Sequence, residues 1–234
     1  MQSNTAPSAP SLPFADSTAL GLFGLTIGCA SLLPVAFGVK EAFSPEALRT
    51  CALFCLLFGA GCQFLAGMMS FANKNMLGGT LLTTFSFNWV MNWWSLSELS
   101  QGRVPSSAVV LAVDVCFLMI FVVMTYAFGF FSKVLFLFLL DIDVMYGLRI
   151  AREVTHTPSL GLPIALATVV LMGLALYIAF ALVLSSSAGR VLLPIGGPLF
   201  KAGPATQAVP APASSRPSAD ASADHTQRFP VLAA

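Results

Sequence analysis

The sequence predicts an all-α membrane protein with six transmembrane helices, and three observations support this fold class. First, 57% of the 234 residues are hydrophobic and 9% are charged, whereas about a quarter of an ordinary soluble domain is charged. Second, the charged residues lie between six charge-poor stretches instead of being spread along the chain. Third, most of these stretches exceed the roughly 20 apolar residues that cross a bilayer as a helix.

The charge balance and the composition of the two ends set the organisation of the chain. Eleven basic and ten acidic residues leave a net charge of +1, which offers no basic surface to nucleic acid. Residues 1–15 and 201–234 are rich in Pro, Ala and Ser and carry too little apolar surface to fold alone. We therefore predict disordered tails at 1–15 and 201–234 around a transmembrane domain over residues 16–200.

The six helices are expected, in order, over residues 20–39, 48–71, 77–96, 105–131, 133–150 and 163–185. The first two are predicted from apolar runs with recognisable ends. In the first helix, Gly21, Gly24 and Gly28 lie on one face, which lets another backbone approach closely. The second helix is preceded by Ser44 as its cap, with Pro45 at its first position.

The later helices differ in polarity. The third helix is unusually polar, and its polar residues are Thr80, Thr83, Thr84, Ser86, Asn88 and Asn92. One face of it must therefore meet protein or water. The fourth begins after Pro105 and the sixth near Pro163. The fifth is the weakest, because the charge-poor run that ends at Arg149 is only about 22 Å long as a helix.

Three carboxylates lie inside predicted helices: Asp114 in the fourth, and Asp141 and Asp143 in the fifth. Depth counted along each helix places all three near the middle of the bilayer, and a short connection makes the two helices neighbours. A carboxylate there costs a few kcal/mol or more unless it is paired, hydrated or protonated. The three acids are either hydrogen-bonded structural groups or proton relay candidates.

Motifs for catalysis or cofactor binding are absent from the sequence. It contains no phosphate loop, nucleophile elbow or zinc motif, so no enzyme activity, cofactor or metal is predicted. Cys51, Cys55 and Cys62 share one helix face, which fits either a soft-metal site or small residues packed between helices. We expect packing.

Three regions of the chain carry recognisable motifs, and the clearest is Gly189-Arg190-Val191-Leu192-Leu193-Pro194-Ile195-Gly196. It is similar to G-R-x-V-L-P-I-G of the acetate uptake transporter family, which includes bacterial succinate–acetate permeases. The other two regions resemble the same family. Residues 58–67, FGAGCQFLAG, are similar to Y-G-G-x-x-Q-x-x-A-G, and residues 75–80 and 83–89 are similar to N-x-F-G-x-T and T-S-Y-G-x-F-W. Residues 16–22 keep only the last three letters of N-P-A-P-L-G-L.

The resemblance implies a fold and a pathway. It implies six helices around a pore in each protomer, a homo-hexamer in membrane lipids, and passage of acetate or another small carboxylate such as succinate. The implied constriction falls on Leu25, Phe85 and Ile142, where Phe85 stands in place of a tyrosine. The polar groups predicted to border the pathway are Gln63, Asn75, Thr80, Thr83 and Thr84.

The chain departs from the family beside the predicted constriction. Asp141 and Asp143 flank Ile142 where relatives have small or hydroxyl residues. Ionised, they would repel a carboxylate by a few kcal/mol. We therefore expect them to be protonated or to relay a proton, so that the substrate crosses as an acid or together with H⁺.

The sequence leaves one leading hypothesis for the function and two alternatives. The leading hypothesis is a carboxylate channel or proton-linked transporter. The alternatives are an ammonium or other cation exporter, which intramembrane acids would suit, and a non-transporting membrane receptor or assembly protein. The resemblance implies a multi-pass protein of the plasma membrane with cytoplasmic termini, although the basic residues on the two sides do not orient it.

Overall fold

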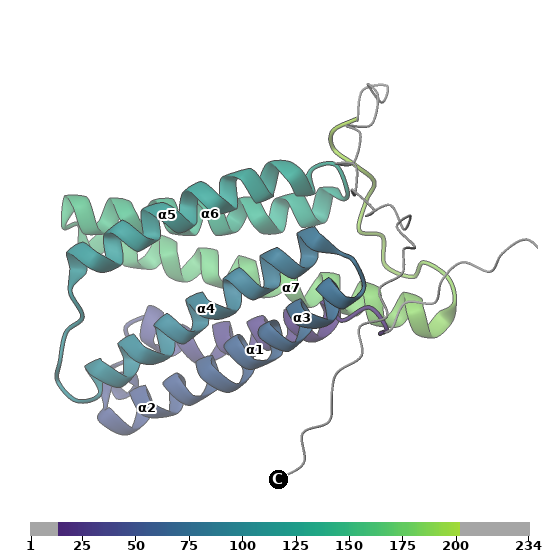
Figure 1. The fold of residues 1–234 in the computed structure, drawn as a ribbon. Helices are drawn as coiled ribbons and strands as arrows, with labels where there is room; N and C mark the ends of the chain where they lie inside the picture. The colour runs from purple at the N-terminus through teal and green to yellow at the C-terminus, as the bar shows by residue number, and fades with distance from the viewer. Residues whose placement is uncertain (1–13, 202–234) are drawn as a thin grey trace, which may run out of the picture. The chain divides into compact units, whose positions relative to one another are not determined.

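Each of the six predicted segments forms a long helix in the computed structural model, which describes residues 14–201 (Figure 1). The long helices are α1 (Thr18–Ala36), the continuous rod of α2 (Pro45–Phe54), η2 (Cys55–Cys62) and α3 (Gln63–Ala72), then α4 (Met76–Leu99), α5 (Ser107–Phe128), α6 (Lys133–Thr155) and α7 (Gly161–Ala188). Two short 3₁₀ turns, η1 (Lys40–Phe43) and η3 (Pro158–Leu160), precede α2 and α7. The tails predicted at 1–15 and 201–234 lie almost wholly outside the described residues, so their disorder stays a prediction.

Local hydrogen bonds explain where several helices begin. The Ser44 hydroxyl accepts from the Ala47 amide at 3.2 Å, with Pro45 at the first helical position, as the sequence predicts. The Asn75 side chain accepts from the Gly78 amide at 2.9 Å and starts α4. Ser132 caps α6 in the same way, through the Leu135 amide.

The helices alternate in direction, so the bundle has two ends that can be defined by residue. At the first end α1, α4 and α6 begin, and α3, α5 and α7 finish. At the second end α1, α4 and α6 finish, and α2, α5 and α7 begin. The most extensive pairings are α1 with α7, α3 with α4, and α5 with α6. In Figure 1 α5 and α6 run side by side.

Small residues let α1, η2 and α4 pack closely. A Cβ added at Gly24 would overlap the Phe58 carbonyl oxygen and the Cys62 side chain. The Trp89 ring occupies the space beside Gly28. The glycine face predicted for the first helix is thus in contact with protein, not with lipid.

The residues after α7 fold back onto the turn between α5 and α6. The Ser132 hydroxyl donates to the Ile195 carbonyl at 2.5 Å, and the Lys133 amide donates to the Gly197 carbonyl at 3.1 Å. The Tyr177 hydroxyl donates to the Pro194 carbonyl at 2.8 Å. The segment that carries the clearest family motif therefore closes the first end of the α5–α6 pair, and Arg190 within it is exposed.

Four helical segments of the described chain are long and apolar enough to cross a membrane: Thr18–Ala36, Pro45–Ala72, Ser107–Phe128 and Pro158–Ala188. These four match predicted spans by length and composition, and the number of six spans stays a prediction. The helices α4 and α6 have 24 and 23 residues, about 36 and 34 Å, which is long enough for a bilayer core of about 30 Å. The hydroxyl and amide side chains of α4 lower its hydropathy, whereas α6 is apolar enough but carries too many acids and arginines.

Candidate functional site

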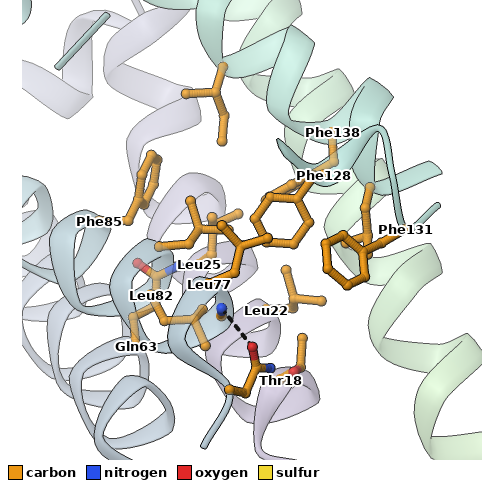
Figure 2. A pocket seen from close by; sticks show the side chains of 15 residues that line it. Thr18, Leu22, Leu25, Gln63, Leu77, Leu82, Phe85, Phe128, Phe131 and Phe138 are labelled. Carbon is orange, nitrogen blue, oxygen red and sulfur yellow. Dashed lines mark hydrogen bonds between the residues drawn. The ribbon is translucent and has the colours of Figure 1, made fainter. Parts of the chain in front are cut away.

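A cavity of about 180 Å³, here called cavity 1, lies at the first end of the bundle (Figure 2). Its walls come from α1, α3, α4, α5 and α6 and are mostly apolar, with six leucines and four phenylalanines among 15 lining residues. Its polar groups are Thr18, Gln63 and Asn75, and none of the residues that line it is charged. A solute in cavity 1 therefore loses most of its hydration without meeting a compensating charge.

A second cavity of about 410 Å³, here called cavity 2, lies toward the second end. It is formed by α1, η1, α4, α6 and α7. Asn88 and Asn92 of α4 line it together with Arg149 and Arg152 of α6. Its wall thus presents two guanidinium groups and no carboxylate among the residues that line it.

The two cavities follow one another along the same helices, and Phe85 lines both. On α1 the lining advances from Leu25 in cavity 1 to Cys29 in cavity 2, and on α6 from Ile142 to Met145. Because these helices run in parallel directions, the same advance along each places one cavity beyond the other along the bundle. Phe85 stands at the boundary.

The three residues of the predicted constriction come together at this boundary. Leu25, Phe85 and Ile142 all line cavity 1, and their exposed fractions are 1%, 2% and 0%. Figure 2 shows Leu25 and Phe85 on the wall of the cavity. Phe121 of α5 packs edge-on against Phe85, with ring centroids 5.2 Å apart, so the boundary is closed by apolar side chains from four helices.

The polar residues predicted along the pathway divide into two groups. Gln63 and Asn75 line cavity 1, and Gln63 is only 2% exposed with its Oε1 atom lacking a hydrogen-bond partner among the described residues. Thr80, Thr83 and Thr84 line neither cavity. They lie on another face of α4, because the face toward the cavities is made by residues 77, 78, 81, 82, 85, 88, 89 and 92.

The π-helical segment η2 sets the position of Gln63. It spans Cys55–Cys62 and ends directly before Gln63, which begins α3. A π-helix has more residues per turn than an α-helix, so it rotates everything that follows it around the helix axis. Such segments are frequent at functional sites. Here the rotation places the buried side-chain amide of Gln63 on the wall of cavity 1.

The three acids are not gathered at one point. The Thr125 hydroxyl donates to Asp143 at 2.6 Å, and Arg149 donates to Asp114 at 3.1 Å. Asp114 is therefore an ion-pair partner near the second end of the α5–α6 pair, about 16 Å along α5 from the level of Asp143. The prediction that all three acids lie at one depth is wrong for Asp114. Asp141 and Asp143 flank Ile142 as predicted, but neither lines cavity 1 or cavity 2.

Sequence reasoning missed three residues that line cavity 2, and Tyr146, which contacts one of them. In the sequence Arg149 only marks the end of a charge-poor run and Arg152 was not singled out, yet both line the cavity. Trp89 lines it too, and its buried indole nitrogen has no acceptor within the described part of the chain. Tyr146 is fully buried beside Phe121, and its hydroxyl likewise has no partner there. The spacing of three residues between Arg149 and Arg152, which puts both on one helix face, was the available signal.

The cysteines form contacts that packing explains. Cys51 donates to the Ser31 carbonyl at 3.1 Å, and Cys55 is fully buried nearby. Within residues 14–201 no group of three or more His, Cys, Asp or Glu side chains could hold a metal ion. The Cys51, Cys55 and Cys62 face therefore provides no metal site of that kind.

Comparison with known proteins finds a likeness in fold to a solved structure. No family model and no curated protein matches the chain. A solved structure, that of the bacterial acetate channel SatP, superposes with a TM-score of 0.68 at 20% sequence identity, over 78% of this chain and 99% of that one. The relationship to acetate uptake transporters that the motifs predict is confirmed at the level of the fold. The chain is an integral membrane protein, all-helical over the residues that the structure describes, with the fold of an acetate channel.

Proposed function

We propose that this protein is a membrane channel or proton-linked transporter for acetate or another small carboxylate. The observation that carries the proposal is the pair of cavities on either side of Phe85, closed from one another by Leu25, Phe85 and Ile142. Hydrophobic constrictions of this kind gate by excluding water, and they pass a neutral acid more readily than a desolvated anion. The likeness in fold to an acetate channel supports the same substrate class.

The sign of the charges favours an anion over a cation. Arg149 and Arg152 line cavity 2, and the acids that would attract ammonium line neither cavity 1 nor cavity 2. The cation exporter hypothesis loses its main support for this reason. The two cavities also favour transport over a receptor without a pathway.

Proton linkage is the finer part of the proposal. Cavity 1 has no charged residue in its lining, so an ionised carboxylate is costly there and its neutral form is favoured. Asp141 and Asp143 each have one buried carboxylate oxygen without a partner among the described residues, but the Oδ2 atom of Asp143 accepts a hydrogen bond from Thr125. Asp141 is thus the better proton relay candidate. Succinate as a substrate, the homo-hexamer, the plasma membrane and cytoplasmic termini stay predictions from the family resemblance.

The test is uptake of labelled acetate by vesicles containing the purified protein, with uptake by protein-free vesicles subtracted. We expect saturable acetate uptake that unlabelled acetate and lactate compete, and no uptake of labelled ammonium. Protein-dependent ammonium uptake without acetate uptake would replace the proposal by the cation exporter. Absence of both would favour a receptor.

A further inference from the structure

Cavity 2 is lined by two arginines, and the position of one of them is fixed by residues outside the cavity. Arg149 donates to Asp114 at 3.1 Å, and its guanidinium carbon lies 5.3 Å from the centroid of the Tyr146 ring. These two contacts, an ion pair and a cation–π contact, hold the Arg149 side chain in one position. A guanidinium that is already ordered loses less conformational entropy when it binds an anion.

The acids that balance this wall lie on its other side. A smaller cavity of about 70 Å³ is lined by Asp114, Glu153, Arg149 and Arg152. Of these four charged residues, only the two arginines also line cavity 2. The four formal charges sum to zero. A solute in cavity 2 contacts the two arginines directly, and the two acids lie on the far side of them.

Further hydrogen-bond donors line the same space. Asn88 and Asn92 bring amide groups, and Trp89 lies between them in the sequence. Trp89 is 2% exposed, and its nitrogen is buried without an acceptor among the described residues. Because that nitrogen has almost no accessible surface, it is covered by neighbouring atoms, and the two amides are the additional donors of cavity 2.

We infer that cavity 2 contains a binding site for an ionised carboxylate, formed by Arg149 and Arg152, and that Asp114 and Glu153 tune its charge in favour of a monocarboxylate over a dicarboxylate. The inference deepens the proposed function and rests on it for the class of ligand. Two guanidinium groups could hold the two ends of a dicarboxylate, but the two acids behind them cancel the charge that a dianion needs. Along the bundle, the site that concentrates the anion lies next to the apolar boundary at Phe85.

The first experiment measures binding without transport, on detergent-solubilised full-length protein. Phenylglyoxal, which modifies arginine, is applied with increasing sodium acetate or succinate at constant ionic strength, and modification of each arginine is read by mass spectrometry. We expect acetate to protect Arg149 and Arg152 but not Arg103, an exposed arginine at the same end of the bundle that pairs with Glu98. Equal modification of all three arginines at every acetate concentration would overturn the site.

Variants test the two parts separately. Arg152→Gln should raise the acetate concentration that half-protects Arg149 about fivefold, and Arg152→Lys should restore part of the loss, while Arg103→Gln should change nothing. Asp114→Asn should lower the half-protecting succinate concentration several-fold, and the acetate value less. Glu153→Gln should act in the same direction without breaking the ion pair, so it serves if Asp114→Asn fails to fold. Equal shifts for both ligands, or none, would overturn the role of the acids.

The failure of this inference and that of the proposed function are distinguishable. If the vesicles show no acetate uptake but acetate protects Arg149 and Arg152, the binding site stands and transport is wrong. If acetate uptake occurs and the two arginines are not protected, transport stands and the site is wrong.

Discussion

At the scale of single residues, Phe85 has the most direct consequence for function. It is 2% exposed and lines both cavities, whereas Phe87, two positions along the same helix, is 55% exposed. Two residues along an α-helix differ by about 200° in direction, so the two phenylalanines point to different environments. The pair therefore separates an effect on the pathway from a general effect of losing an aromatic ring in α4.

We predict that Phe85→Ala increases acetate uptake several-fold and admits larger acids such as succinate, because it removes the ring at the boundary between the cavities. Phe87→Ala is the control and should leave uptake unchanged. The measurement is initial uptake of labelled acetate and succinate by vesicles with matched amounts of protein. Equal uptake by Phe85→Ala and the original protein would show that the ring does not limit passage.

At the scale of elements, the contact of α1 with η2 depends on a missing side chain. A Cβ at Gly24 would overlap the Phe58 backbone carbonyl, which cannot move aside as a flexible side chain would. At Gly173 of α7 nothing lies within 4 Å of such a Cβ. Both glycines lie inside long helices, but the space beside Gly24 is filled and the space beside Gly173 is empty.

Gly24→Val is accordingly expected to destabilise the bundle by about 1–3 kcal/mol, the usual cost of overpacking a close contact. Because Gln63 directly follows η2, the displacement should also reduce acetate uptake. Gly173→Val should be close to neutral in both respects. Thermal unfolding in detergent, followed by circular dichroism, measures the first effect, and a Gly24→Val protein as stable as Gly173→Val would contradict the close contact.

At the scale of the whole molecule, proton linkage would connect the apolar cavity to the acids beside Ile142. Cavity 1 favours a neutral solute, so protein-dependent acetate uptake should rise as the external pH falls. Asp141 and Asp143 are the groups that could deliver the proton from α6. Their positions outside the cavity linings mean that they would act through the protein and not by contact with acetate along the pathway.

Replacing Asp141 and Asp143 together by Asn should reduce uptake at low pH and flatten its pH dependence, since Asn cannot release or take up a proton. Asp143→Asn alone should have the smaller effect, because Asp143 already holds a hydrogen bond from Thr125. Uptake is measured across a pH series, with protein-free vesicles subtracted at each pH. If the double variant has the same dependence of uptake on pH as the original protein, these acids take no part in transport.

Much of the fold could be predicted from composition and the spacing of charges. Each of the six charge-poor stretches forms a helix, and the Ser44–Pro45 cap forms as expected, because both depend on local sequence. The constriction residues Leu25, Phe85 and Ile142, carried over from a resemblance, lie together on one cavity wall. The threonines of α4 show the limit, because polarity indicates that a helix face is unusual but not which face looks inward.

The sequence by itself determined that this chain is an integral membrane bundle of helices, because burial of apolar side chains in a bilayer depends on composition and length alone. Only the tertiary structure decided that Arg149 and Arg152 line a cavity and that Asp114 pairs with Arg149 and not with the other acids. It also set the direction of Gln63, through the π-helical turn before it. These features depend on the rotation of each helix about its axis, which is fixed by contacts between residues far apart in the chain.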